Sequence, residues 1–155
     1  MRPIPHRLVR SVLVGSMIMM WTAGDDRIVA LSQQRTPVTL TRIYTGPDGQ
    51  THAEQIDVAL APNLLYGREQ SETVKAASSY FVRSPSGLVQ DWHPANARRY
   101  VITLSGRGEV ELGGGQRIPL EPGRVLLAED LTGKGHITRN VGNADWTALF
   151  VQLDQ

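Results

Sequence analysis

The chain has 155 residues, of which 41% are hydrophobic and 20% charged, and its formal net charge is +1. This length and apolar content predict one globular domain with a buried core. A net charge near zero without a long lysine and arginine run gives no support for a nucleic-acid partner. The absence of cysteine excludes disulfides, thiolate metal sites and cysteine nucleophiles.

The N-terminal residues have the layout of an export signal. Arg2, Arg7 and Arg10 precede an uncharged, mostly apolar run over residues 11–23, which is shorter than the roughly 20 apolar residues that a membrane span needs. We therefore predict that residues 1–30 are a leader or signal peptide, and no membrane span. A peripheral helix and a misassigned start codon are the alternatives. With a signal peptide the protein would be periplasmic or secreted, and otherwise cytoplasmic.

A β-hairpin is predicted to follow the leader. Residues 38–44 and 52–60 are two runs with β-strand character, and the Gly-Pro-Asp-Gly between them is a turn signal. Residues 62–77 are polar, and we predict a loop with a short helix that has Ser71 as its N-cap.

Short strands separated by glycine, proline and asparagine turns fill the rest of the chain. The predicted strands cover residues 79–83, 88–92, 99–105, 109–112, 117–120, 124–128, 136–139 and 146–153. Such spacing without amphipathic helices predicts an all-β fold, an antiparallel sandwich or barrel. Alternation makes both sides of 99–105 apolar, so this strand is predicted to be central, with Arg99 and Tyr100 on opposite sides.

Two spaced motifs in this region resemble those of the cupin family. The first cupin motif is Gly, five residues, His, one residue, His, three or four residues, Glu, six residues, Gly. Residues 87–106 keep these spacings, with His93 in place but with Ala95 and Arg99 at two metal-ligand positions. Residues 123–140 are similar to the second motif, whose histidine and asparagine correspond to His136 and Asn140.

The resemblance implies a jelly-roll barrel, an antiparallel double-stranded β-helix, formed by a single domain over residues 38–155. The segments TRIYTGPDG, DWHPA and AEDLTGKGH are also similar to those of small single-domain bacterial cupins. That similarity supports a domain that begins near Thr39 and implies no particular reaction. Cupins also commonly form homodimers, so residues 38–60 are predicted to serve such an interface.

The resemblance further implies one divalent transition metal, such as Zn, Mn, Fe or Ni, held by three histidines and a carboxylate. Only His93 and His136 remain as metal ligands here, and Glu129 or Asp130 would have to complete the shell together with water. The alternative is that both histidines are hydrogen-bonded pocket residues without a metal.

Arg99 favours an anionic ligand in place of a metal ion. If it points inward beside the two histidines, it would bind a carboxylate through paired, charge-assisted hydrogen bonds. The alternatives are that Arg99 pairs with Glu129 or Asp130 at the rim, or that it points outward and Tyr100 points inward.

The stretch AEDLTGKGH contains Glu129, Asp130, Lys134 and His136. We predict that Glu129 and His136, together with His93, are the general acid and base of an enzyme. Asp130 and Lys134 are expected to be solvated loop charges, although Lys134 is also a candidate for ligand binding.

Two further residues complete the predicted ligand-binding set. Trp92 and Asn140 are candidates for the pocket lining, with ordinary core packing as the alternative for Trp92. Two classes of function remain open. One is an enzyme, such as an isomerase, lyase or oxygenase, acting on a small polar or acidic metabolite. The other is a non-catalytic binding or sensory module for a small molecule such as a carboxylate.

Overall fold

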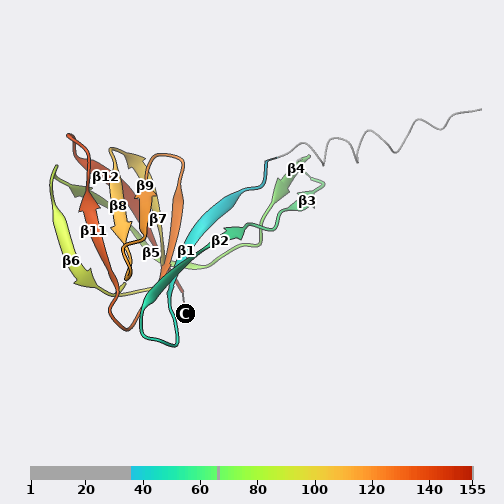
Figure 1. Cartoon of the computed structure of the whole chain (residues 1–155). Helices are drawn as coiled ribbons and strands as arrows, with labels where there is room; N and C mark the ends of the chain where they lie inside the picture. Colours follow the sequence, from blue (N-terminus) through green and yellow to red (C-terminus); the bar gives the residue numbers. More distant parts are fainter. Residues whose placement is uncertain (1–35, 66, 155) are drawn as a thin grey trace, which may run out of the picture. The chain divides into compact units, whose positions relative to one another are not determined.

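The computed structural model describes residues 36–65 and 67–154, and the predicted leader over residues 1–30 lies outside them (Figure 1). Residues 37–155 form one compact unit, which contains all the described strands. In chain order these are β1 (Thr39–Thr45), β2 (Thr51–Asp57), β3 (Ala61–Asn63), β4 (Arg68–Gln70), β5 (Ala76–Ser84), β6 (Val89–His93), β7 (Arg99–Ser105), β8 (Gly108–Glu111), β9 (Arg117–Leu120), β10 (Val125–Glu129), β11 (His136–Asn140) and β12 (Trp146–Leu153).

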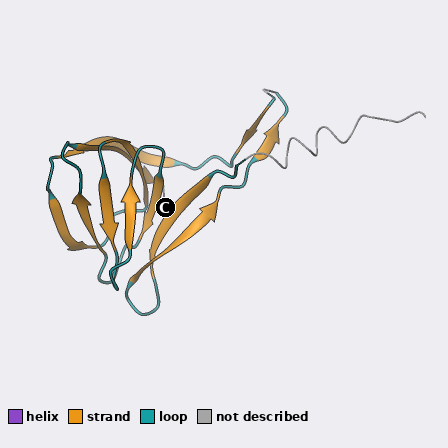
Figure 2. Ribbon diagram, turned by 45° about the horizontal axis from the view of Figure 1, so that its top comes forward, coloured by secondary structure: helices purple, strands orange, loops and turns teal. Residues whose placement is uncertain are grey.

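The strands form two large sheets and one small one. The six-stranded sheet has the order β2-β1-β10-β7-β12-β5, the four-stranded sheet has the order β6-β11-β8-β9, and β3 pairs with β4. Every pairing is antiparallel except that of β1 with β10. Figure 2 shows the two large sheets curving around a common interior. The predicted all-β jelly-roll fold is confirmed, and β7 lies inside its sheet as predicted.

The region between β2 and β5 differs from the prediction. The helix expected to begin at Ser71 does not form, and β3 and β4 occupy part of the predicted loop. A hydrogen bond of 3.0 Å from Asn63 Nδ2 to Gln70 Oε1 links the two strands, and Gly67 has a φ of +59° that favours a turn. The Ser71 hydroxyl donates to the carbonyl of Glu72 instead of accepting from a backbone N–H as an N-cap does.

The hydrophobic core lies between the two large sheets. It combines buried apolar side chains from the six-stranded sheet with others from and beside the four-stranded sheet, namely Ile43, Val101, Leu126, Ala128, Trp146 and Ala148 with Val110, Leu112, Ile118 and Leu120. Burying each large apolar side chain contributes roughly 1.5–3 kcal/mol. The described residues contain no helix long and apolar enough to cross a membrane.

Candidate functional site

A cavity of about 460 Å³ opens among the core residues and is lined by both large sheets. Its volume falls in the range of roughly 300–1,000 Å³ that is usual for small-molecule sites. The polar part of the lining comprises Ser84, Gln90, His93, Asn96, Arg99, His136, Thr138 and Asn140. Aliphatic and aromatic side chains supply most of the remainder. Among the lining residues that the structure describes, Arg99 alone is charged at neutral pH whatever the state of the histidines.

The two histidines of the cavity are brought together by strand pairing. His93 ends β6 and His136 begins β11, the two are register partners, and their ring centroids lie 4.6 Å apart. Gly135 makes this approach possible. A Cβ at that position would lie 2.1 Å from the His93 carbonyl oxygen, and the residue has a φ of +74°. Only glycine satisfies both conditions.

Each histidine uses Nδ1 in a hydrogen bond. The His93 Nδ1 atom lies 2.6 Å from the carbonyl oxygen of Asp91, and the His136 Nδ1 atom lies 2.6 Å from Oδ2 of Asp130. A carbonyl and a carboxylate only accept, so both Nδ1 atoms are the donors. In the neutral rings the lone pair is therefore on Nε2, the nitrogen that remains for a ligand.

Asp130 lies behind His136 in the interior. Its exposed fraction is 0%, and its Oδ2 atom also accepts a hydrogen bond of 3.1 Å from Thr51 Oγ1. Its Oδ1 atom has no hydrogen-bond partner among the described residues. The expectation that Asp130 is a solvated loop charge is wrong, because Asp130 directly follows β10 and its carboxylate is held in the interior by hydrogen bonds from His136 and Thr51.

The electrostatic surroundings keep His93 neutral. Burial lowers the pKa of its imidazole below the ordinary value of 6.5, and the nearby His136 and Arg99 lower it further. The hydrogen bond to Asp91 and the charge of Asp130 raise the pKa, but they do not outweigh the burial. His93 thus offers a lone pair at neutral pH.

Arg99 lines the cavity from the first position of β7. Its guanidinium donates to the Tyr80 hydroxyl at 3.1 Å and to the Asn96 side-chain oxygen, and it lies 5.3 Å from the centroid of the Phe150 ring. These partners are neutral, and no described carboxylate forms an ion pair with Arg99. Its positive charge is therefore held in place but left without a counter-charge.

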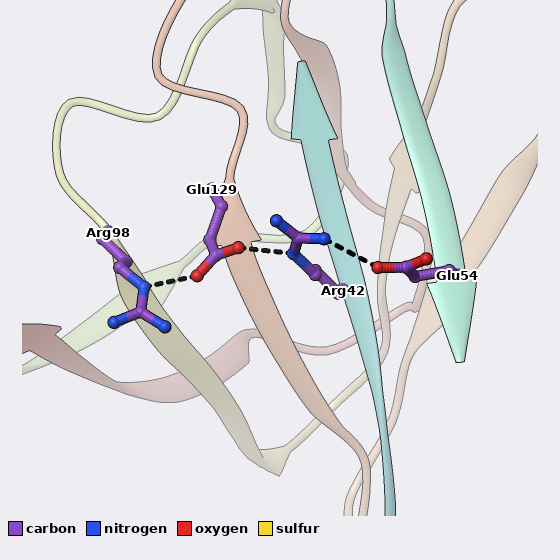
Figure 3. A network of polar contacts seen from close by, with 4 residues as sticks. All are labelled: Arg42, Glu54, Arg98 and Glu129. Atoms are coloured by element: carbon purple, nitrogen blue, oxygen red, sulfur yellow. Dashed lines mark hydrogen bonds and ion pairs between the residues drawn. The ribbon is translucent and has the colours of Figure 1, made fainter. Parts of the chain in front are cut away.

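Glu129 lies away from the cavity. Arg42 and Arg98 both donate to its carboxylate, and Arg42 also donates to Glu54 at 2.7 Å (Figure 3). We call these four residues the outer ion-pair network. Burial alone would raise the pKa of Glu129, but the two arginine donors outweigh it and hold the pKa below its ordinary value of 4.5. A paired carboxylate outside the lining is not placed for the predicted acid–base role, because the strand alternation at the end of β10 turns Ala128 inward and Glu129 outward.

Three other predicted residues also lie outside the cavity lining. Tyr100 faces a second groove on the opposite side of β7, together with Ile102 and Val125. Lys134 Nζ is 3.8 Å from the Trp92 ring centroid, which makes these two residues a cation–π pair. The structure thus brings together His93, His136 and Arg99, and it leaves Glu129, Tyr100, Trp92 and Lys134 elsewhere.

Asn140 lines the cavity, but its side chain already has partners. Its amide group donates to the carbonyls of Ser84 and Ala144 at 2.9 and 3.0 Å, and its oxygen accepts from Gly142 N–H at 3.1 Å. With both donors and one acceptor position engaged by backbone, Asn140 supports the turn after β11 more than it offers contacts to a ligand.

The donor set fits a tightly held metal poorly. In the part of the chain that the structure describes, no group of three or more histidine, cysteine, aspartate or glutamate side chains is arranged to hold an ion. His93 and His136 offer two imidazole nitrogens, Ala95 has no donor, and the cation of Arg99 opposes a second cation nearby.

Sequence reasoning missed the residues that hold the site in place. Tyr80, Asn96 and Phe150 position Arg99, and Thr51 contacts Asp130. Tyr80 and Phe150 are register partners on β5 and β12. Their alternation within each strand was readable, but the pairing of strands 70 residues apart was not.

No family model matches the sequence, and no curated protein does. Solved structures that are similar to part of this chain include three proteins of different bacteria. A cupin superfamily protein from Desulfitobacterium hafniense has 14% identity and a TM-score of 0.38, over 54% of this chain and 84% of its own. A protein from Neisseria meningitidis has 10% identity and a TM-score of 0.38, over 59% of this chain and 93% of its own. A Salmonella typhimurium protein that is described as an ethanolamine utilization protein Q has 12% identity and a TM-score of 0.35, over 77% of this chain and 98% of its own.

Proposed function

We propose that this chain, which has a cupin-type barrel, binds a small molecule that has a carboxylate and an apolar remainder, with Arg99 as the anchor. The observation that supports the proposal is the uncompensated guanidinium of Arg99 in a cavity that is otherwise mostly apolar. A fixed cation without a counter-charge is stabilised by an anionic guest.

The geometry around Arg99 supports binding in a defined orientation. Two of its five N–H groups donate to Tyr80 and Asn96, and no other described residue accepts from the remaining three. Because those two partners and the Phe150 ring already restrict the side chain, little conformational entropy is lost when a carboxylate binds. The apolar walls would receive the rest of the molecule.

Titration calorimetry of the purified protein with phenylpyruvate and benzoate, and with benzamide as the uncharged analogue of benzoate, tests the proposal. We expect the carboxylates to bind and the amide to bind at least about tenfold more weakly, because the amide forms no charge-assisted pair. Arg99→Gln should lose this preference. Arg98→Gln is the matched control, since the neighbouring arginine pairs with Glu129 outside the cavity. Carboxylate binding that is unchanged in Arg99→Gln would contradict the proposal.

The alternative function is that of a metal enzyme, with His93 and His136 as ligands. Metal analysis of the purified protein tests it against the proposal. A near-stoichiometric metal that is lost in a His93→Ala, His136→Ala double variant would support the metal enzyme and overturn the metal-free site.

Export and homodimer formation stay predictions. Within one chain β1 already pairs with both β2 and β10, so strand exchange over residues 38–60 is not needed to complete the sheet. Light scattering that finds only monomer would contradict the dimer. Cell fractionation would test the predicted periplasmic or secreted location.

A further inference from the structure

The strongest unexplained feature of the cavity is the buried carboxylate behind His136. Asp130 is fully buried, its Oδ2 atom accepts from His136 Nδ1 and Thr51 Oγ1, and its Oδ1 atom has no hydrogen-bond partner among the described residues. A buried carboxylate is costly unless a positive charge or several donors compensate it. Carboxylate binding by Arg99 does not explain why the fold contains one here.

His136 is the group that can compensate this charge. It contacts Asp130 at 2.6 Å, and the salt bridges of the described residues give Asp130 no arginine or lysine partner. The hydrogen bond from His136 Nδ1 to Asp130 fixes the orientation of the ring and leaves Nε2 as its accepting nitrogen. Because His136 also lines the cavity, it is placed to accept a proton from a ligand bound there.

The other groups of the cavity allow proton transfer to His136 beside a carboxylate bound at Arg99. Arg99 lies close enough to His93 to influence its charge state, and the His93 ring is 4.6 Å from that of His136. His93 is neutral, so it does not repel an imidazolium at His136. Arg99, His93 and His136 all line the same cavity, so a ligand bound at Arg99 shares that cavity with the histidine pair.

We propose that the cavity is catalytic and that His136, oriented by Asp130, is a general base that removes a proton from C3 of a 2-oxo acid. The proposal rests on carboxylate binding by Arg99. A 2-oxo acid fits because its carboxylate adjoins a carbonyl group, and that carbonyl acidifies the C–H bonds of the next carbon. A guanidinium can donate to a carboxylate and to the adjacent carbonyl oxygen at once, and the described residues accept from only two of the five N–H groups of Arg99.

The proposed step is balanced without an oxidant or a reductant. The C3–H proton moves to Nε2 of His136, the electrons of the C–H bond form the C2–C3 double bond, and the carbonyl electrons move to the oxygen, which gives an enolate. Return of a proton from Nε2 to C3 restores the 2-oxo acid, and delivery to the oxygen gives the enol. Asp130 is a positioning residue, because it contacts the imidazole and not the reacting atoms.

Proton exchange in D2O tests the proposal directly. Pyruvate and phenylpyruvate would be incubated with the purified full-length protein, and loss of the C3–H signal would be followed by ¹H NMR against a protein-free sample. We expect exchange well above the background. His136→Gln should lower the protein-dependent rate by about 100-fold or more, the range usual for loss of a general base.

The chain provides a matched control for this variant. His52 and Asp48 form a second histidine–aspartate pair, with 2.9 Å between Nε2 and Oδ1, but the pair is exposed and lies outside the cavity lining. His52→Gln should exchange the C3 protons as fast as the unchanged protein. An equal loss of rate in both variants would overturn the assignment to His136.

Asp130→Asn tests the positioning role and covers the case in which His136→Gln does not fold. We expect a rate lower by about tenfold or more, and a changed proportion of the His136 tautomers in ¹H–¹⁵N NMR, which a purely structural role would not alter. An unchanged rate and an unchanged tautomer would overturn the role of Asp130.

Calorimetry with the same acids separates the two proposals. Wild-type protein that binds pyruvate or phenylpyruvate but does not exchange its C3 protons overturns the catalytic proposal and leaves the binding proposal intact. Protein that binds neither these acids nor benzoate overturns both.

Discussion

Two clusters contain residues that are adjacent in the sequence, but the charges of one cluster are paired and those of the other are not. Arg98 and Glu129 belong to the outer ion-pair network, where each carboxylate contacts an arginine. The next residue in each case is Arg99, which lines the cavity, and Asp130, which lies behind the cavity residue His136, and these two form no ion pair with each other. An arginine and an acidic residue thus pair with each other in the outer ion-pair network, whereas the neighbouring arginine and acidic residue at the cavity remain apart.

This difference indicates that the outer ion-pair network stabilises the protein, whereas the cavity residues are arranged to bind a ligand. In the outer network the charges are satisfied by the protein itself. In the cavity, Asp130 is hydrogen-bonded by His136 and Thr51, and Arg99 is hydrogen-bonded by Tyr80 and Asn96, so that one cation and two imidazole nitrogens remain for a ligand. Unsatisfied groups of this kind lower stability and are typical of functional sites.

A backbone change beside the histidine pair of the cavity should have the largest effect on stability. In Gly135→Ala the new Cβ would lie 2.1 Å from the His93 carbonyl oxygen, at a residue with a φ of +74°. We expect the free energy of unfolding to fall by about 2 kcal/mol or more, because the clash adds to the backbone strain of roughly 1–2 kcal/mol. Urea denaturation measures it.

Gly114→Ala is the control for this substitution. Gly114 has a φ of +85° but no atom within 4 Å of an added Cβ, so its replacement adds strain without a clash. Equal losses of stability in the two variants would show that the close approach of Gly135 to the His93 carbonyl does not matter for stability.

The sequence predicted the fold better than it predicted the cavity. The limits of β7, β9 and β12 agree with the prediction to the residue, because glycine and proline turns bound alternating apolar runs that show the strands directly. Glu129 and Asp130 were assigned the wrong way round, since each side chain's direction depends on where β10 ends, and sequence pattern fixes an end only to within a few residues. The partners of Arg99 depend on long-range strand pairing that the sequence does not state.

The outer network should stabilise the protein moderately and in a pH-dependent way. Because the pKa of Glu129 is lowered in the folded state, its contribution is fully present above the ordinary pKa of 4.5 and is lost as the pH falls through the folded-state pKa. We expect Glu129→Gln to lose about 1 kcal/mol at pH 7, since the arginines are partly exposed. Urea denaturation from pH 7 to pH 3 should show this difference shrinking below pH 4.5, and a constant difference would contradict it.

The smallest effect on stability is expected for substitution of Arg99. Comparing it with the same substitution at Arg98 separates the cavity arginine from the arginine of the outer ion-pair network. Arg99→Gln removes a cation that has no ion-pair partner among the described residues, and its hydrogen bonds to Tyr80 and Asn96 are exposed to solvent, so their loss costs little. We expect the free energy of unfolding to change by less than about 0.5 kcal/mol, whereas Arg98→Gln should lower it by roughly 0.5–1 kcal/mol through loss of its pair with Glu129. Urea denaturation of both variants without ligand measures the two values. If Arg99→Gln were the more destabilising change, Arg99 would be a structural residue of the barrel, and its charge would not be available to a carboxylate.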